Sequence, residues 1–261
     1  MTSRHATSPL AKPLLALDGG SPSIADRVHV AAFGAIGWPW LLRSLSGGSR
    51  QSRAALLERL DLPESALPNL GSWKADVGFL KLIVDTILAA KPRMVVEFGA
   101  GASTLVAARA LQMSGQGHLL SFDQDQAFAE ANRSWLAEHD LHADIRAAPL
   151  VRAPGEWPGL WYDTPDLPAA IDLLIIDGPP WSIHPFVRGA AESLFERVSV
   201  GGIVLLDDGA RPGERVVARR WRARWPDIDF RLLKPGSKGT LVGIRHGRGT
   251  PQERRGAEVY A

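Results

Sequence analysis

The sequence predicts an α/β fold in which a mostly parallel, doubly wound sheet has helices on both faces and ends in an antiparallel hairpin. Short apolar runs alternate with amphipathic stretches from residue 74 to residue 206, and two further strand candidates flank a glycine-containing turn after them. Such alternation is typical of parallel sheets, because the crossover between parallel strands is usually a helix. The 261 residues suffice for one such domain with an appendage.

The expected elements follow in a regular order along the chain. Residues 1–69 are predicted to hold a tail and a helical segment in which Pro39 breaks or starts a helix, residues 70–246 the main domain, and residues 247–261 a polar tail. The seven expected strands are Met94–Phe98, His118–Phe122, Asp144–Ala147, Ile171–Ile176, Gly202–Leu206, Ile228–Leu233 and Thr240–Ile244. The expected helices are Lys74–Ala90 with Ser72 as its cap, Ser103–Met113, Ala127–His139, Phe186–Val198 and the basic stretch Glu214–Trp225.

Composition excludes several classes of function. The 30 Lys and Arg nearly balance the 28 Asp and Glu, and a net charge of +2 gives little attraction to nucleic acid or to an anionic membrane. The basic stretch Glu214–Trp225 is typical of a solvated helix face. The chain has no cysteine, and we find neither a signal peptide nor a run of about 18 apolar residues. We therefore expect a cytoplasmic protein without a membrane span, whose oligomeric state is open.

The most informative motif follows the first expected strand of the sheet. Glu97 ends an apolar run, Gly99 and Gly101 follow, and Ser103 and Thr104 begin a helix. Glycines at the carboxyl end of a strand let a ligand approach the backbone, and open α/β sheets bind ligands in that crevice. Because Thr104 stands where the dinucleotide fingerprint has glycine or alanine, the spacing favours another nucleoside cofactor over NAD.

A carboxylate stands at the end of the second expected strand. Asp123 lies 22 residues after Gly101, and a carboxylate at this place in a nucleotide-binding sheet can accept both hydroxyls of a ribose. The alternative is that Asp123 caps the helix Ala127–His139, and the two roles can also be divided, with Asp125 as the cap.

Four motifs in order, EFGAGAST, FDQD, IDLLIIDGPPW and GGIVLLDDGA, resemble those of the class I S-adenosylmethionine-dependent methyltransferases. The narrower resemblance is to the small-molecule branch that includes catechol O-methyltransferase. It implies a Rossmann-like fold with S-adenosyl-L-methionine as the cofactor. In that family, the residue matched by Glu97 lies near the methionine part, the turn matched by Gly99, Gly101 and Ser103 lies against the cofactor, and the acid matched by Asp123 holds the ribose.

The resemblance also implies a reacting side formed by Asp177, Asp207 and Asp208 at the ends of neighbouring strands. Three carboxylates suit Mg²⁺, and the catechol-type pattern holds a metal with the acids matched by Asp177 and Asp207, but has an amide in place of Asp208. Pro180 replaces the lysine of that pattern, so a metal-assisted and a metal-free reaction both stay open. Asp177, Asp208 and His184 are the candidate bases. The competing interpretation is a loop cap for Asp177 and a satisfied loop residue for Asp208 and for His184.

Aromatic side chains near these motifs are candidates for the walls of a site. Trp157, Trp161, Tyr162 and Trp181 could contact a planar or sugar acceptor, and Trp73 could cover the cofactor, although such residues are more often core anchors. The resemblance therefore implies methyl transfer to a hydroxyl of a small acceptor, such as a sugar, polyketide or phenol.

Two alternative functions compete with this prediction. The first is a degenerate S-adenosylmethionine-binding module that acts in partner assembly, which the missing lysine after Asp177 would suit. The second is an NAD-dependent oxidoreductase, which the glycine spacing disfavours. Tyr162 and Tyr260 are the only tyrosines, and neither begins a Tyr-x-x-x-Lys motif.

Overall fold

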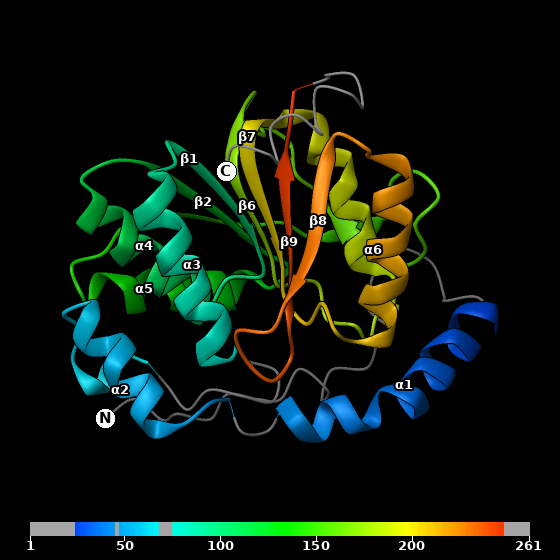
Figure 1. The fold of residues 1–261 in the computed structure, drawn as a ribbon, viewed down its shortest axis with the longest axis horizontal. Coiled ribbons are helices and arrows are strands. Elements are labelled where there is room, and N and C mark those ends of the chain that lie inside the picture. Colours follow the sequence, from blue (N-terminus) through cyan, green and yellow to red (C-terminus); the bar gives the residue numbers. More distant parts are fainter. Residues whose placement is uncertain (1–23, 45–46, 68–74, 248–261) are drawn as a thin grey trace, which may run out of the picture.

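The apolar strand segments of the sequence pair into one seven-stranded sheet in the order β3-β2-β1-β6-β7-β9-β8 (Figure 1). The computed structural model describes residues 24–44, 47–67 and 75–247. The strands are β1 (Met94–Phe98), β2 (His118–Asp123), β3 (Asp144–Ala147), β6 (Ile171–Ile176), β7 (Val198–Leu206), β8 (Ile228–Leu233) and β9 (Thr240–Arg245). The five neighbouring strands β3, β2, β1, β6 and β7 run parallel, while β9 is antiparallel to β7 and to β8. The predicted fold class is confirmed.

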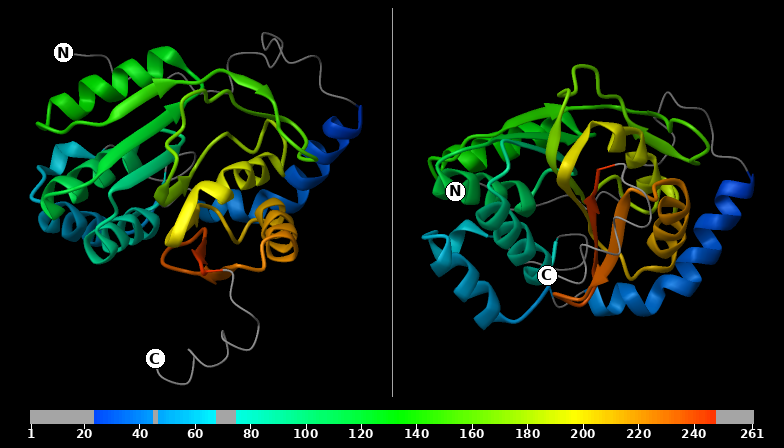
Figure 2. Two further views of the ribbon diagram at one scale, coloured as in Figure 1. Left: turned by 90° about the horizontal axis from the view of Figure 1, so that it is seen from above. Right: turned by 45° about the horizontal axis from the view of Figure 1, so that its top comes forward.

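Helices cover both faces of the sheet. Successive side chains of a strand point to opposite faces, and those of the central strands are mostly apolar on both, so each face has to be buried. Val95 and Leu119 pack in one core cluster, whereas their neighbours Val96 and Leu120 pack in another. The first face carries α3 (Val77–Ala90), α4 (Ala102–Ser114) and α5 (Gln126–Ala137), and the second carries the 3₁₀ helix η4 (Val187–Arg197) and α6 (Pro212–Arg224). Figure 2 shows these two helical layers from two further directions.

The elements before the sheet lie along the edge at which the parallel strands end (Figure 1). They are α1 (Ile24–Ser44), α2 (Arg50–Arg59) and the 3₁₀ turn η3 (Glu64–Ala66). Pro39 lies inside α1, so the prediction that it breaks or starts a helix is wrong. A proline removes one backbone donor from a helix, and α1 bears this loss only five residues before its end. No helix within the described ranges is long and apolar enough to cross a membrane.

Helix α3 begins at Val77, later than predicted, because Asp76 is its cap. The Asp76 carboxylate accepts a hydrogen bond from Phe79 N at 2.9 Å and another from Ser237 N at 2.9 Å, which ties the β8–β9 turn to the start of the helix. Ser72, Trp73 and the predicted boundary at residue 70 lie outside the described residues, as do residues 1–23 and 248–261.

Two features between β3 and β7 differ from the prediction. The segment expected as the helix Phe186–Val198 is a 3₁₀ helix, in which the Gly189 carbonyl accepts a hydrogen bond from Trp221 Nε1 at 3.0 Å. The second feature is an unpredicted antiparallel pair, β4 (Leu150–Arg152) and β5 (Leu160–Tyr162). Three-residue strands are too short for the alternation of side chains to be visible in a sequence. Tertiary contacts, rather than local patterns, define both features.

Candidate functional site

The glycine turn after β1 joins a strand end to the start of α4. Gly99 has φ +94°, and a Cβ there would lie 2.7 Å from Gly178 N, so only glycine allows the turn to approach the end of β6 this closely. A Cβ at Gly101 would instead meet no atom within 4 Å. The turn therefore has one glycine fixed by packing, and a second one that faces open space beside the strand ends.

Glu97 lies beneath this turn and is fully buried. Its Oε2 accepts hydrogen bonds of 2.6 Å from Thr104 Oγ1 and from Ser121 Oγ, and the Ser103 side chain also bonds the carboxylate. Its Oε1 has no hydrogen-bond partner within the described part of the chain. Burial raises the pKa of Glu97 to about 7, since loss of hydration outweighs these hydrogen bonds. The structure thus keeps a carboxylate with an unused acceptor below the turn.

We expect Glu97→Gln to raise the free energy of unfolding of the cofactor-free protein at pH 8 by about 3 kcal/mol. The folded protein holds the Glu97 proton up to about pH 7, whereas the unfolded chain releases it near pH 4.5. The wild type therefore loses stability as the pH rises from about 4.5 through 7, and the variant does not lose this contribution. Urea unfolding at pH 5 and pH 8 measures the difference.

The matched control for this prediction is Glu130→Gln on the exposed face of α5. It should leave the pH dependence of the unfolding free energy as in the wild type. Lower stability of Glu97→Gln than of the wild type at pH 8 would contradict the desolvation argument.

The acid that ends β2 and the acid two residues later have separate roles. Asp123 is 5% exposed, and its Oδ1 accepts a hydrogen bond from Asp125 N at 2.9 Å. Burial raises the pKa of Asp123 to about 6, against the lowering effect of backbone donors that include the Ala100 amide of the glycine turn. Asp125 caps α5 by accepting a hydrogen bond from Phe128 N at 3.0 Å. Asp123 is thus left facing the glycine turn.

Three further acids meet where β6 and β7 end side by side. Ile176 pairs with Leu206, so Asp177 directly follows β6 at the level at which Asp207 and Asp208 follow β7. Each of the three carboxyl groups offers one oxygen, and these oxygens lie within 4.8 Å of one another. Asp207 and Asp208 are buried, whereas Asp177 is half-buried. The structure brings together the three residues that the sequence proposed for the reacting side.

Three basic side chains that the sequence analysis did not single out surround these acids. Arg188 NH1 donates to Asp208 Oδ2 at 3.2 Å, Arg211 NH2 also donates to Asp208 Oδ2, and Lys238 Nζ lies 3.7 Å from Asp208 Oδ1. Arg188 and Lys238 are 6% and 5% exposed. They come from η4 and from the β8–β9 turn, and no pattern in the sequence connects these segments with the strand ends.

The basic side chains separate the protonation properties of the acids. Burial alone would raise the pKa of Asp208, but Arg211, Lys238 and Arg188 together hold it well below its usual range. Burial, with the neighbouring Asp208 charge, raises the pKa of Asp207 well above its usual range. Burial raises the pKa of Asp177 to about 6, although Arg188 opposes the change. Asp177 is more exposed than Asp207 and Asp208, and of the residues that the structure describes only Arg188 pairs with its carboxylate, at 3.6 Å. It can therefore accept a proton near neutral pH.

His184 lies against α1, and its contacts do not join it to the three acids. Its Nδ1 accepts a hydrogen bond from Phe186 N at 3.1 Å, its Nε2 lies 3.7 Å from Asp26 Oδ1, and its ring is 5.7 Å from the His29 ring. Burial lowers the pKa of His184 to about 4. This neutral imidazole positions α1 over the loop after β6.

The aromatic candidates divide between the core and the site. Trp157 and Trp161 are core residues, the first packed on Gly189 and the second against the Phe98 ring at 5.0 Å. Tyr162 is also buried, but its hydroxyl donates to Gln124 Oε1 at 3.2 Å, next to Asp123. Burial and the Asp123 charge raise the pKa of Tyr162 well above its usual value, so it remains a hydroxyl donor at the crevice.

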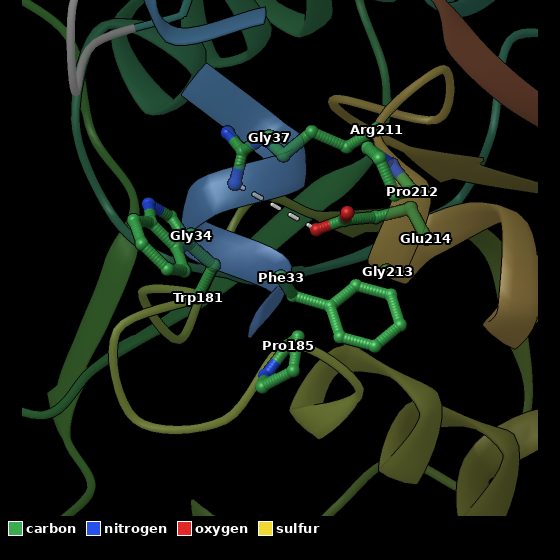
Figure 3. Close-up of a pocket in the computed structure, with 9 residues that line it drawn as sticks. All are labelled: Phe33, Gly34, Gly37, Trp181, Pro185, Arg211, Pro212, Gly213 and Glu214. Carbon is green, nitrogen blue, oxygen red and sulfur yellow. Dashed lines mark ion pairs between the residues drawn. The ribbon is translucent and has the colours of Figure 1, made fainter. Parts of the chain in front are cut away.

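A pocket lies between α1, the loop after β6 and the start of α6 (Figure 3). The rings of Phe33, Trp181 and Pro185 form apolar walls, and the ion pair of Arg211 with Glu214, at 3.8 Å, lies on its inner side. Because Arg211 also binds Asp208, this pocket adjoins the acidic cluster. A second hollow, further along the same edge, lies between α2, the start of α3 and the β8–β9 turn.

Residues 96–209 match a family model described as a methyltransferase domain. This segment begins in β1, contains the glycine turn and Asp123, and ends just after Asp208. This segment of the chain is therefore similar to a methyltransferase domain. A comparison with curated proteins finds no match.

Solved structures have the same fold as this segment and the elements that flank it. One is the O-methyltransferase TomG from Streptomyces achromogenes, involved in tomaymycin synthesis and solved with SAM: 17% identity, 86% of this chain and 100% of that chain covered, TM-score 0.50. Another is an O-methyltransferase from Bacillus cereus solved with SAH: 14% identity, 83% and 99% covered, TM-score 0.51. At these identities the comparison establishes the shared fold.

Proposed function

We propose that the methyltransferase domain, with bounds at residues 70–246, transfers a methyl group from S-adenosyl-L-methionine to a hydroxyl oxygen of a small acceptor. The observation that carries this proposal is the pair of buried carboxylates, Glu97 and Asp123, on either side of a glycine turn that contains no basic residue. A cofactor without phosphates, with a ribose and a positively charged amino acid part, fits this charge pattern. The O-methyltransferases of the same fold that were solved with SAM or SAH support it.

The residues around the turn would hold this cofactor in distinct ways. Asp123 would accept the two ribose hydroxyls, and the unbonded Oε1 of Glu97 would accept from the methionine end. Ser103 and Thr104 orient Glu97 from the first turn of α4. The open space at Gly101 allows close approach of a ligand to the backbone.

Asp177 is the base that we assign to the reaction. When bound, S-adenosylmethionine supplies a methyl group already activated by its sulfonium. The protein then has to orient the acceptor oxygen and remove its proton, which the half-buried Asp177 carboxylate can accept. Asp208 is a poor base, because it is engaged by Arg188, Arg211 and Lys238.

The acceptor that we propose is a small hydroxylated ring compound. The pocket in Figure 3 is lined by the rings of Phe33 and Trp181 and by the Arg211–Glu214 ion pair, a combination that suits a ring with polar substituents such as a phenol or a sugar. Its cavity volume of about 20 Å³ holds about one water molecule, so α1 has to move before such a ring can enter. A cytoplasmic location and a soluble acceptor are part of this proposal.

Two measurements on the full chain test the proposed function. Calorimetry with S-adenosylhomocysteine should show one site per chain, and labelled S-adenosylmethionine should transfer its methyl group to members of a panel of phenols and sugars. Absence of S-adenosylhomocysteine binding would refute the proposal. Binding without transfer to any hydroxylated compound would favour the alternative, a cofactor-binding module that acts in partner assembly.

A further inference from the structure

The acids at the ends of β6 and β7 have a donor set that, taken alone, suits a divalent cation. Asp177, Asp207 and Asp208 each offer an oxygen within 4.8 Å of the others, and carboxylates are preferred ligands of Mg²⁺. Both oxygens of Asp207 and Oδ1 of Asp208 are buried without a hydrogen-bond partner among the described residues. A buried carboxyl group of this kind either gains a compensating cation or keeps its proton.

Arg188 already supplies a cation that touches all three acidic residues. Its NH1 donates at 3.2 Å to the Asp207 carbonyl and at 3.2 Å to Asp208 Oδ2. Its NH2 donates to the Asp177 carbonyl and lies 3.6 Å from Asp177 Oδ1, while its Nε donates to the Pro179 carbonyl at 3.2 Å. One guanidinium thus binds carboxylates as a metal would, and it also binds backbone carbonyls at both strand ends.

The charges around Arg188 leave little place for a second cation. Four carboxyl groups face one another in this cluster, and three permanently basic side chains face them. The acids are Asp177, Asp207, Asp208 and Glu214, and the bases are Arg188, Arg211 and Lys238. A divalent ion would change the net charge of the ionised cluster from one negative to one positive, beside a guanidinium that the strand ends hold in place. The cluster with its bases therefore does not fit a divalent metal.

We propose that Arg188 occupies the place of a divalent cation in this site, so that the three acids are organised by a side chain and the domain works without a metal. Arg188 is a positioning residue, because it holds Asp177 and the ends of β6 and β7 at fixed places. This inference concerns the site of the proposed methyl transfer and rests on that function only for its activity measurement.

Mn²⁺ binding to the full chain tests this proposal without reference to activity. Electron paramagnetic resonance should show no stoichiometric Mn²⁺ on the wild type. Arg188→Met should bind one Mn²⁺ per chain, with an affinity at least about tenfold higher than that of any residual binding to the wild type. Mn²⁺ should also raise the Tm of Arg188→Met and not that of the wild type. The matched control is Arg224→Met, which removes an α6 arginine that pairs with Glu156 and Glu192 away from the acids.

Measurements on the wild type are sufficient to overturn the proposal. Stoichiometric Mn²⁺ binding to the wild type that disappears in Asp207→Asn would overturn it, as would methyl transfer that is lost on chelation and restored by Mg²⁺. Folded Arg188→Met that gains no Mn²⁺ site would also overturn it, and if this variant does not fold, the wild-type measurements decide. Failure to bind S-adenosylhomocysteine would refute the proposed function while leaving the Mn²⁺ result valid.

Discussion

Asp123→Ala is expected to weaken S-adenosylhomocysteine binding by about 100-fold or more while the protein remains folded. Each charge-assisted hydrogen bond contributes about 1.5–3 kcal/mol, and the loss of two such bonds to a ribose corresponds to at least a hundredfold in affinity. The cofactor-free protein should stay folded, because burial disfavours the charged form of Asp123 and this offsets much of the loss of its hydrogen bonds with backbone amides. Calorimetry measures the affinity, and urea unfolding measures the stability.

The neighbouring acid provides the control for this prediction. Asp125→Ala removes the cap of α5, so it should lower the unfolding free energy by about 1 kcal/mol and change the affinity by no more than about threefold. If Asp123→Ala binds S-adenosylhomocysteine as the wild type does, the assignment of Asp123 to the ribose is wrong.

Asp177→Asn is expected to lower the turnover of methyl transfer by about 100-fold to 1,000-fold without weakening S-adenosylhomocysteine binding. The amide cannot take the acceptor proton, although it is nearly the same size as the carboxyl group. Since burial raises the pKa of Asp177 to about 6, wild-type turnover should also fall as the pH decreases below about 6, when the base becomes protonated. Turnover measured from pH 5 to pH 8 checks both statements.

Asp172, near the amino end of β6, offers a matched control for Asp177, which follows the carboxyl end of that strand. Asp172 accepts hydrogen bonds from Arg93 N, Met94 N and Ser199 Oγ at the amino end of β6, far from the strand ends that form the site. Asp172→Asn should therefore lower the stability and leave the turnover of the folded enzyme close to that of the wild type. Equal turnover losses in the two variants would show that Asp177 acts through stability rather than as a base.

The strands of the sheet could be predicted from the sequence because they are buried on both faces. Met94–Phe98 and Ile171–Ile176 are apolar except for Glu97 and Asp172, and their observed bounds agree with the predicted ones. The division of roles between Asp123 and Asp125 was also among the predicted alternatives, since helix capping has a local sequence signature. The roles of these acids toward a ligand remain predictions.

The bases of the acidic cluster could not be predicted, because tertiary contacts alone bring them there. Arg188 belongs to a helix whose pattern resembles an ordinary amphipathic one, and Lys238 belongs to a turn that pairs with Asp208 only after β9 has joined the sheet. Tyr162 reaches the crevice through the β4–β5 pair, which has no visible sequence pattern. His184 could not be placed for the same reason, since its partners lie on α1.

The contact between Gly99 and Gly178 couples the glycine turn, which is the proposed cofactor side, rigidly to the loop that carries the proposed base, Asp177. Asp177 and Gly178 both donate backbone hydrogen bonds of 2.8 Å to the Phe98 carbonyl, immediately before the glycine turn. Neither loop can shift without carrying the other. Changes of acceptor specificity can therefore arise in α1 and its pocket, by substitutions or altered helix lengths, without disturbing the distance between base and methyl donor.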